Sequence, residues 1–260
     1  MDFKPDLSRI SWAKGSFDLP SAFYKLQIPS VTTIIGDIIP DPDLEKWKQE
    51  VGEEDAKKIS EAASNRGTSM HTFIEEFMKH LSKTKDASDS LKHTQIESQK
   101  KLKEQNIPQD KIDIGRDMFY KFYYSDYASN FDQLLATELI LHSKKYYYRG
   151  KLDVIYNESL YGTVISDFKT SSSAIKKDSI KEKKYKYQLG GYCIAVEDMF
   201  EEKNLKINKA SIICIQTKSD LVQAIELLGD ELEYYKTEFK TLVKNWHIKN
   251  GQEFLTNKII

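Results

Sequence analysis

The fold of this chain is decided by the stretch that runs from Arg149-Gly150-Lys151-Leu152-Asp153 to Ser166-Asp167-Phe168-Lys169-Thr170. Two short apolar segments, at 152–156 and 163–168, lie in it on either side of a polar turn. Each segment is too short for a helix and is rich in valine, isoleucine and aromatic residues. The stretch therefore predicts two neighbouring strands of a β-hairpin.

This hairpin carries two carboxylates and a lysine. Asp153 lies on the first strand and Asp167 on the second, so formation of the hairpin brings them together. Lys169 shares a face with Asp167, because side chains alternate along a strand. Carboxylate oxygens are the ligands that magnesium and manganese prefer, and a lysine beside them suits a reaction on a phosphodiester. A solvated strand face is the alternative, although unpaired charge is costly beside so apolar a run.

Composition limits the class of protein. The 260 residues, 40% hydrophobic and 30% charged, are enough for one sizeable globular domain. No apolar run approaches the ~20 residues of a membrane span, and the pattern of a signal peptide is missing, so we expect no membrane partner and a cytoplasmic location. The net charge of −1 argues against non-specific coating of nucleic acid but leaves room for a local basic groove. The two cysteines, Cys193 and Cys214, exclude a disulfide framework and a four-cysteine site.

Periodicity and turn signals predict an order of elements. Residues 29–35 enter a short helix, Asp43 caps a helix through Trp47, and a charged helix covers 53–63. Gly67 opens a helix to Leu81, and the polar segment 82–90 is expected to be a mobile loop. The remaining elements are helices at 94–105 and 110–130, strands at 134–142, 147–156 and 162–169, a helix at 178–198, strands at 210–216 and 222–227 (the latter could begin a helix), and a final helix from Gly229-Asp230 to His247. This order predicts an α/β fold with a central mixed β-sheet flanked by helices, not a doubly wound sheet.

Further polar residues accompany the hairpin. His71 and Glu75 lie four residues apart in Gly67-x-x-x-His71-x-x-x-Glu75, and therefore on one helix face. Gln188 and Tyr192 have the same spacing on the helix after the hairpin, and Glu138 lies on the strand before it. The helix after the hairpin and its entry are rich in lysines, namely Lys176, Lys177, Lys181, Lys183, Lys184 and Lys186.

In this order the motifs resemble the PD-(D/E)XK nuclease superfamily, in its RecB-like exonuclease branch. That branch has a helix with G-x-x-x-H-x-x-x-E, strands with G-x-x-D and D-x-K, and a helix with Q-x-x-x-Y. The segments 29–34, 44–48 and 66–71 resemble more closely the mitochondrial genome maintenance exonuclease and its phage and bacterial relatives, and the likeness spans about residues 20–200. Leu152 replaces the proline of the superfamily pattern, which is usual in this branch. Two cysteines are too few for the relatives that carry an iron–sulfur cluster.

The resemblance implies a restriction-endonuclease-like core in a single nuclease domain, 1–260. Within it, 1–66 is a helical and extended N-terminal portion, 82–130 is a helical insertion that forms an arch, and 131–260 is the catalytic core, completed by helix 67–81. The implied activity is that of a metal-dependent DNA exonuclease that prefers single-stranded DNA with a free end. The setting would be a bacterial or phage-infected cell, and the oligomeric state, a monomer included, stays open.

The resemblance also assigns roles to residues. Asp153, Asp167, His71 and the backbone carbonyl of Phe168 would bind one or two Mg²⁺ or Mn²⁺ ions, without an iron–sulfur cluster. Lys169 would orient a water and neutralise the phosphate, Gln188 would hold the Lys169 amine or a phosphate oxygen, and Tyr192 would pack behind it. Glu138 would orient Lys169 or touch a second ion, while Glu75 is either a site residue or a structural partner of a basic group. Contact with DNA phosphates, or simple solvation, is expected for Lys176, Lys177, Lys181 and Lys184.

Several alternatives stay open at this point. The aromatic residues between 119 and 131 either stack on bases of a single strand or form core. A nuclease that resects double-stranded ends, like that of phage lambda, shares the D-x-K hairpin. A nucleic-acid-binding module that has lost catalysis is a further alternative, and intact Asp153, Asp167 and Lys169 argue against it. A scaffold with coincidental motifs is the last, and it predicts no metal binding.

Overall fold

The computed structural model describes residues 28–131 and 133–252, so predictions for residues 1–27, 132 and 253–260 lie outside the described residues. A five-stranded sheet forms the centre of this part, with the strands in the order β1-β2-β3-β4-β5. The strands are β1 (Leu134–Ser143), β2 (Tyr148–Glu158), β3 (Gly162–Ser171), β4 (Lys209–Gln216) and β5 (Val222–Leu228). Each predicted strand is confirmed to within about two residues, and 222–227 is a strand and not the start of a helix.

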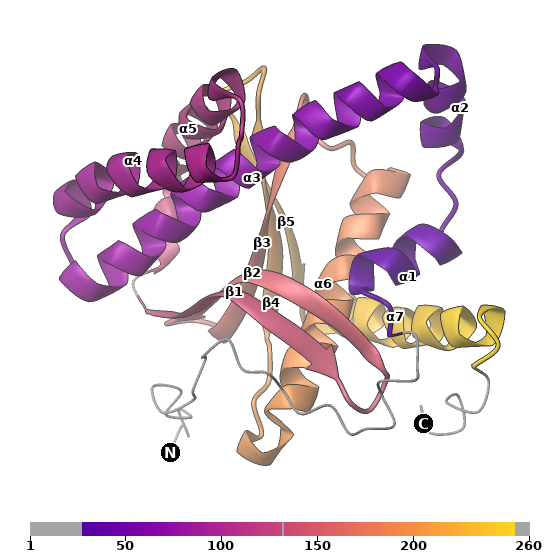
Figure 1. Ribbon diagram of the computed structural model, residues 1–260. Coiled ribbons are helices and arrows are strands. Elements are labelled where there is room, and N and C mark those ends of the chain that lie inside the picture. The colour runs from indigo at the N-terminus through magenta and orange to yellow at the C-terminus, as the bar shows by residue number, and fades with distance from the viewer. Residues whose placement is uncertain (1–27, 132, 253–260) are drawn as a thin grey trace.

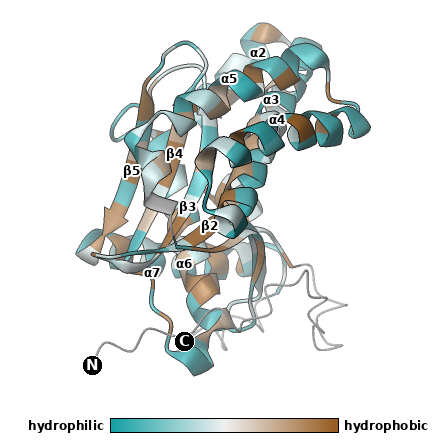
Figure 2. Cartoon of the chain, turned by 90° about the vertical axis from the view of Figure 1, so that its left-hand side faces the viewer, coloured by the Kyte–Doolittle hydropathy of each residue, from teal (hydrophilic) through white to brown (hydrophobic). Residues whose placement is uncertain are grey.

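The sheet is mixed, as predicted. β3 and β4 are parallel, and the other neighbouring pairs are antiparallel. A parallel pair needs a long crossover, which here contains α6 (Ile180–Met199). β1 and β2 run across the direction of β3, β4 and β5 (Figure 1). All eight residues of β4 are buried, and Figure 2 shows this largely apolar strand between β5 and β3.

Helices cover both faces of the sheet and enclose two hydrophobic clusters. On one face lie α3 (Glu53–Thr84), α4 (Ala87–Glu104) and α5 (Gln109–Tyr123) (Figure 1). On the other lie α1 (Val31–Ile38), α6 and α7 (Gly229–Lys249). The remaining elements are α2 (Pro42–Val51), η3 (Asp126–Phe131) and η4 (Glu201–Lys203). The α/β fold with a central mixed sheet flanked by helices is therefore confirmed.

The first correction concerns the helix that carries His71. It does not open at Gly67 but runs unbroken for 32 residues, through the expected boundary at 66/67. A glycine inside a helix costs only about 1 kcal/mol, less than the packing of the face that includes Met70, Phe73 and Phe77 contributes. The Asp43 cap is also wrong, because Asp41 accepts the bond from Leu44 N–H at 3.2 Å.

The second correction concerns residues 82–90, which do not form a mobile loop. α3 ends at Thr84, Lys85 adopts a left-handed conformation with φ 58°, and α4 begins at Ala87. Asp86 caps α4 by accepting the Asp89 N–H at 2.9 Å. The Ser90 hydroxyl contacts His80 across the turn at 3.0 Å. Polar composition misled the prediction, because these polar groups satisfy helix ends and one another.

Within residues 82–130, α4 and α5 pack on the rest of the described chain, and a role of this segment as an arch stays a prediction. α4 and α5 contact α3, and α5 contacts β4. The Lys121 ammonium donates to the carbonyls of Gln216, Thr217 and Ser219 at 2.9–3.2 Å. Phe119 and Phe122 belong to the core, whereas Tyr124 is 76% exposed. α5 ends at Tyr123 and not at 130, and the side chain of Phe131 lies outside the described side chains.

No described helix is long and apolar enough to cross a membrane.

Close packing of α6 against α7 depends on Gly190 and Gly191 of α6. A Cβ on Gly190 would lie 2.5 Å from the backbone oxygen of Tyr235 on α7, and one on Gly191 would meet the Phe239 ring at 2.7 Å. The Gly191 carbonyl also accepts the buried Tyr148 hydroxyl at 2.6 Å. These glycines are therefore packing residues and do not form a phosphate-binding loop.

We predict that Gly190→Ala lowers the free energy of unfolding by about 1–3 kcal/mol, because backbone of α7 must move to admit the methyl group. Urea denaturation measures this loss. Gly36→Ala is the matched control, since a Cβ there meets nothing within 4 Å in α1, and a gain of roughly 0.5–1 kcal/mol is expected. Equal effects of the two substitutions would contradict the packing argument.

Candidate metal centre

The candidate site lies where the ladder between β2 and β3 ends. Their pairing runs from Glu158–Gly162 to Val154–Ser166, and beyond that point β2 pairs with β1 and β3 with β4. Asp153 and Asp167 are the next residues on the two strands. Strands that part leave room between them for side chains, and both predicted carboxylates stand at this opening.

Asp153 is held by contacts from two other elements. Its Oδ2 accepts the Phe168 N–H of β3 at 2.6 Å. Its Oδ1 lies 3.3 Å from Nδ1 of His71, which α3 presents over the sheet. The His71 ring also packs edge-on against Phe168, with centroids 6.3 Å apart. The structure therefore brings His71 and Asp153 together, as the sequence predicted.

Asp167 is almost fully buried and connects to α6. Its Oδ2 lies 2.5 Å from the Lys169 ammonium and accepts no further hydrogen bond among the described residues. Its Oδ1 accepts the Gln188 amide at 3.3 Å, and the same amide donates to the Tyr192 hydroxyl at 2.8 Å. Gln188 thus contacts Asp167 and not the Lys169 amine, and Tyr192 lies behind Gln188 as expected.

Burial and neighbouring charges shift the pKa values of this cluster. Burial raises the pKa of Asp153, but His71, Lys169 and the Phe168 N–H bring the pKa below its ordinary value. Burial and the charge of Asp153 raise the pKa of Asp167 to about 6. Burial lowers the pKa of Lys169, but the two carboxylates raise it above its ordinary value, so its amine stays protonated. Burial likewise lowers the pKa of His71, and Asp153 more than reverses the effect.

Glu138 of β1 completes a second group around Asp153. It stands between Thr137, which pairs with Val154, and Leu139, which pairs with Leu152, and so lies opposite Asp153. Its φ of 54° is rare for a non-glycine residue in a strand, and such strain persists where the surrounding structure holds it. Glu138 forms an ion pair with Lys151, and the described contacts include none to Lys169.

The residues present fit a divalent cation. His71, Glu138 and Asp153 each offer a ligand atom, and these atoms lie within 4.8 Å of one another. One nitrogen and two carboxylate oxygens form a donor set that suits Mn²⁺ well. Asp167 lies outside this group, although its Oδ2, which Lys169 alone contacts among the described residues, is a further oxygen at the same opening.

The other predicted residues are placed as follows. Glu75 forms an ion pair with Lys79 on α3, and a role for Glu75 in the site stays a prediction. Lys181 donates to Ser171 at 3.3 Å and Lys184 to Asp41 at 3.0 Å, so both already have partners. Lys176 and Lys177 are exposed, and a role for the Phe168 carbonyl as a ligand stays a prediction.

Sequence reasoning missed two neighbours of the site. The Tyr185 ring lies 5.9 Å from the Lys169 ammonium, and burial raises the pKa of its hydroxyl. Helical spacing to Gln188 is the signal that points to Tyr185. Lys151, which pairs with Glu138, shares the face of Asp153 because it lies two residues before it.

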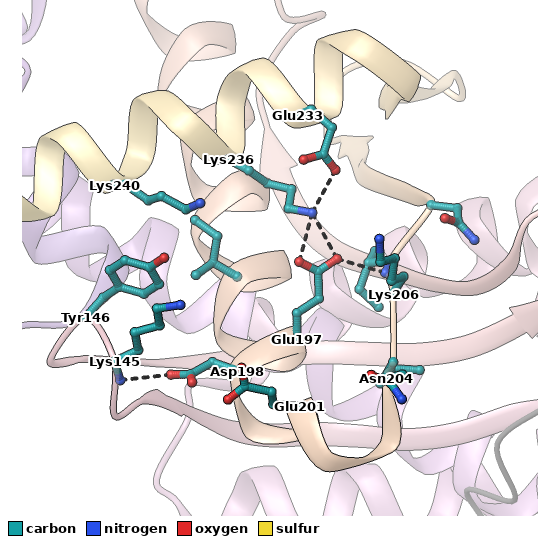
Figure 3. A pocket seen from close by; sticks show the side chains of 14 residues that line it. Lys145, Tyr146, Glu197, Asp198, Glu201, Asn204, Lys206, Glu233, Lys236 and Lys240 are labelled. Atoms are coloured by element: carbon teal, nitrogen blue, oxygen red, sulfur yellow. Dashed lines mark hydrogen bonds and ion pairs between the residues drawn. The ribbon is translucent and has the colours of Figure 1, made fainter. Parts of the chain in front are cut away.

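A cleft lies elsewhere, between the end of α6, α7 and the β1–β2 turn (Figure 3). Its volume is about 450 Å³. The Lys236 ammonium contacts both Glu197 and Glu233 at 2.8 Å, and Asp198 accepts the Lys145 N–H at 3.1 Å. Because many of its charges satisfy one another, this cleft does not compete with the carboxylate cluster as a site.

One protein-family model matches most of the chain. The model of the PD-(D/E)XK nuclease superfamily matches residues 45–258. The chain belongs to this superfamily, whose members hydrolyse phosphodiester bonds and typically use a divalent metal ion.

Solved structures give weaker likenesses. The crystal structure of a "Putative exonuclease" from Eubacterium rectale is 13% identical, with a TM-score of 0.45, over 74% of this chain and 68% of that chain. The structure of SSO0001 is 15% identical, with a TM-score of 0.30, over 67% of this chain and 84% of that one. A search of the curated proteins finds no match.

We predict that Mn²⁺ stabilises the protein through Asp153. Mass action gives about 2.7 kcal/mol at roughly 100 times Kd, so thermal unfolding should shift upward by several degrees. Asp153→Asn should lose most of this shift, whereas Asp113→Asn, on the outer side of α5, should retain it. Differential scanning fluorimetry with and without EDTA measures the difference, and equal shifts in the two variants would exclude Asp153 as a ligand.

Proposed function

We propose that this superfamily member is a metal-dependent DNA exonuclease that prefers single-stranded DNA with a free end and acts in replication, repair or recombination. The observation that carries the proposal is the cluster of Asp153, Asp167 and Lys169 at the opening between β2 and β3, with His71 above it. The single-strand preference and the need for an end rest on the sequence resemblance.

Lys169 acts as a fixed cation in this proposal. Burial lowers its pKa, but the two carboxylates raise it above the ordinary value, which favours the ammonium form. Asp167 holds the ammonium at 2.5 Å, and the Tyr185 ring lies beside it. A preorganised positive charge of this kind stabilises the charge that develops on a phosphate during hydrolysis. In this proposal Lys169 serves the phosphate electrostatically.

Gln188 and Tyr192 position Asp167. The Gln188 amide binds both Asp167 Oδ1 and the Tyr192 hydroxyl, so α6 fixes the orientation of the carboxylate from behind. Asp153 is fixed in the same way by the Phe168 N–H. Both carboxylates are thereby held before any ligand arrives, which avoids reorganisation during the reaction.

His71, Glu138, Asp153 and Asp167 would hold the divalent ion or ions. When bound, such an ion activates water for attack and offsets negative charge on the phosphate and leaving oxygen. The intact cluster also argues against a module that only binds nucleic acid, since buried charges without a function are costly to keep.

We predict that a linear single strand is degraded in Mg²⁺ or Mn²⁺ and not in EDTA. Lys169→Met should lower kcat by roughly 10²–10³, because one preorganised charge at the phosphate is lost. Strands labelled at the 5′ or the 3′ end, resolved on denaturing gels, report the rate and the polarity. Lys240→Met, at the cleft of Figure 3, is the matched control and should retain full activity.

Two further substrates test the finer parts of this proposal. A circular single strand should survive, since it has no end, and its cleavage would show an endonuclease instead. Rapid digestion of a blunt duplex would favour a role like that of the lambda nuclease. If folded, metal-loaded protein cleaves none of these substrates, the remaining alternative is a nucleic-acid-binding module without catalysis.

A further inference from the structure

A second cleft of about 280 Å³ adjoins the metal centre. It lies between the start of α1, the start of β2 and Tyr192, and its lining includes Ser30, Thr32, Arg149 and Lys151. Tyr192 connects it to the centre, because the Tyr192 hydroxyl accepts the Gln188 amide that also contacts Asp167. The cleft is thus one side chain away from the carboxylate cluster.

The strand that supplies Asp153 also supplies the cations of this cleft. Arg149, Lys151 and Asp153 alternate along β2, so their side chains leave the same face. Two residues of a strand span about 6.6 Å, which places the two cations at regular steps from Asp153. Arg149 is exposed and has no ion-pair partner among the described residues, whereas Lys151 pairs with Glu138.

The opposite wall is the start of α1. Ser30 caps this helix by accepting the Thr33 N–H at 3.0 Å, and its hydroxyl contacts those of Thr32 and Thr33 at 3.0 and 2.7 Å. Thr32 and Thr33 are exposed. A helix start carries partial positive charge, which adds to that of Arg149 across the cleft.

Main-chain contacts hold the two walls in place. The Arg149 N–H donates to the carbonyl of buried Pro29 at 2.9 Å, and Ser30 and Arg149 form an isolated parallel bridge. Gly150 lies under the Tyr192 ring, where a Cβ would approach to 2.8 Å. The Pro29-Ser30-Val31-Thr32 segment and the Arg149-Gly150-Lys151 segment are therefore assembled into one surface, although they are far apart in the sequence.

We propose that this cleft binds a phosphate group of the DNA strand next to the bond that is cut. This inference rests on the proposed function. A guanidinium presents a fork of donors that matches phosphate oxygens, and hydroxyl groups on the opposite wall supply further donors. Two sources have this chemistry, a backbone phosphodiester within the strand and a terminal phosphate monoester.

The test is equilibrium binding of fluorescent single strands in EDTA, measured by anisotropy with wild type and Arg149→Gln. The variant should bind roughly tenfold more weakly, which is the usual effect of losing a charged hydrogen bond. The slope of log K against log salt concentration should fall in magnitude by about 0.7, since one phosphate contact is lost. Thr32→Val should weaken binding by a smaller factor, through the loss of a hydroxyl on the opposite wall.

Arg116→Gln is the matched control, because Arg116 pairs with Asp113 at 3.1 Å on the outer layer. Strands with a 5′-phosphate, a 3′-phosphate or hydroxyls at both ends separate the two sources. An equal loss on all three indicates a backbone phosphate, and a loss confined to one phosphorylated end indicates the terminal group. Binding by Arg149→Gln equal to that of Arg116→Gln on every strand would overturn the proposal.

Failure of this proposal is distinguishable from failure of the proposed function. If wild type cleaves but Arg149→Gln binds like wild type, the phosphate site is wrong and the nuclease stands. If wild type binds with the expected dependence on Arg149 but cleaves nothing, the phosphate site stands without the nuclease.

Discussion

The structure depends on how two carboxylates are accommodated where a β ladder ends. Asp153 and Asp167 follow the last pair of β2 and β3; Asp167 is buried, and the side chain of Asp153 is only 12% exposed. Burial of a charged carboxylate is costly unless other groups compensate for the lost water. The Phe168 N–H, His71 and Lys169 supply the compensation, each from a fixed position. The site forms where β2 and β3 separate. The compensating groups make the two charged carboxylates tolerable beside the core.

This constraint explains the arrangement of the helices around the sheet. α3 must cross the sheet to bring His71 to Asp153, and its apolar face is anchored by α5 and by the sheet. α6 must lie close behind β3 to bring Gln188 to Asp167, and Gly190 and Gly191 let α7 pack tightly against α6 on its far side. The two helical layers therefore hold opposite sides of one small polar cluster.

Prediction from the sequence succeeded where a pattern is short-range. Alternating apolar residues identify β2 and β3, and i, i+4 spacing identifies the faces that carry His71 and Gln188. It failed at Gly67 and at 82–90, because tertiary packing and capping by Asp86 overcame weak local preferences. The left-handed conformation of Glu138 has no local signal in the sequence.

The sequence by itself determined the sheet, the superfamily and the identity of the charged residues at its centre, because these follow from periodicity and from motif order. Only the tertiary structure decided which groups meet: Gln188 with Asp167, Glu138 with His71 and Asp153, and Ser30 with Arg149. The physical reason is that the distance between side chains from different elements depends on where strands part and how closely helices pack. A single sequence carries no local signal for either.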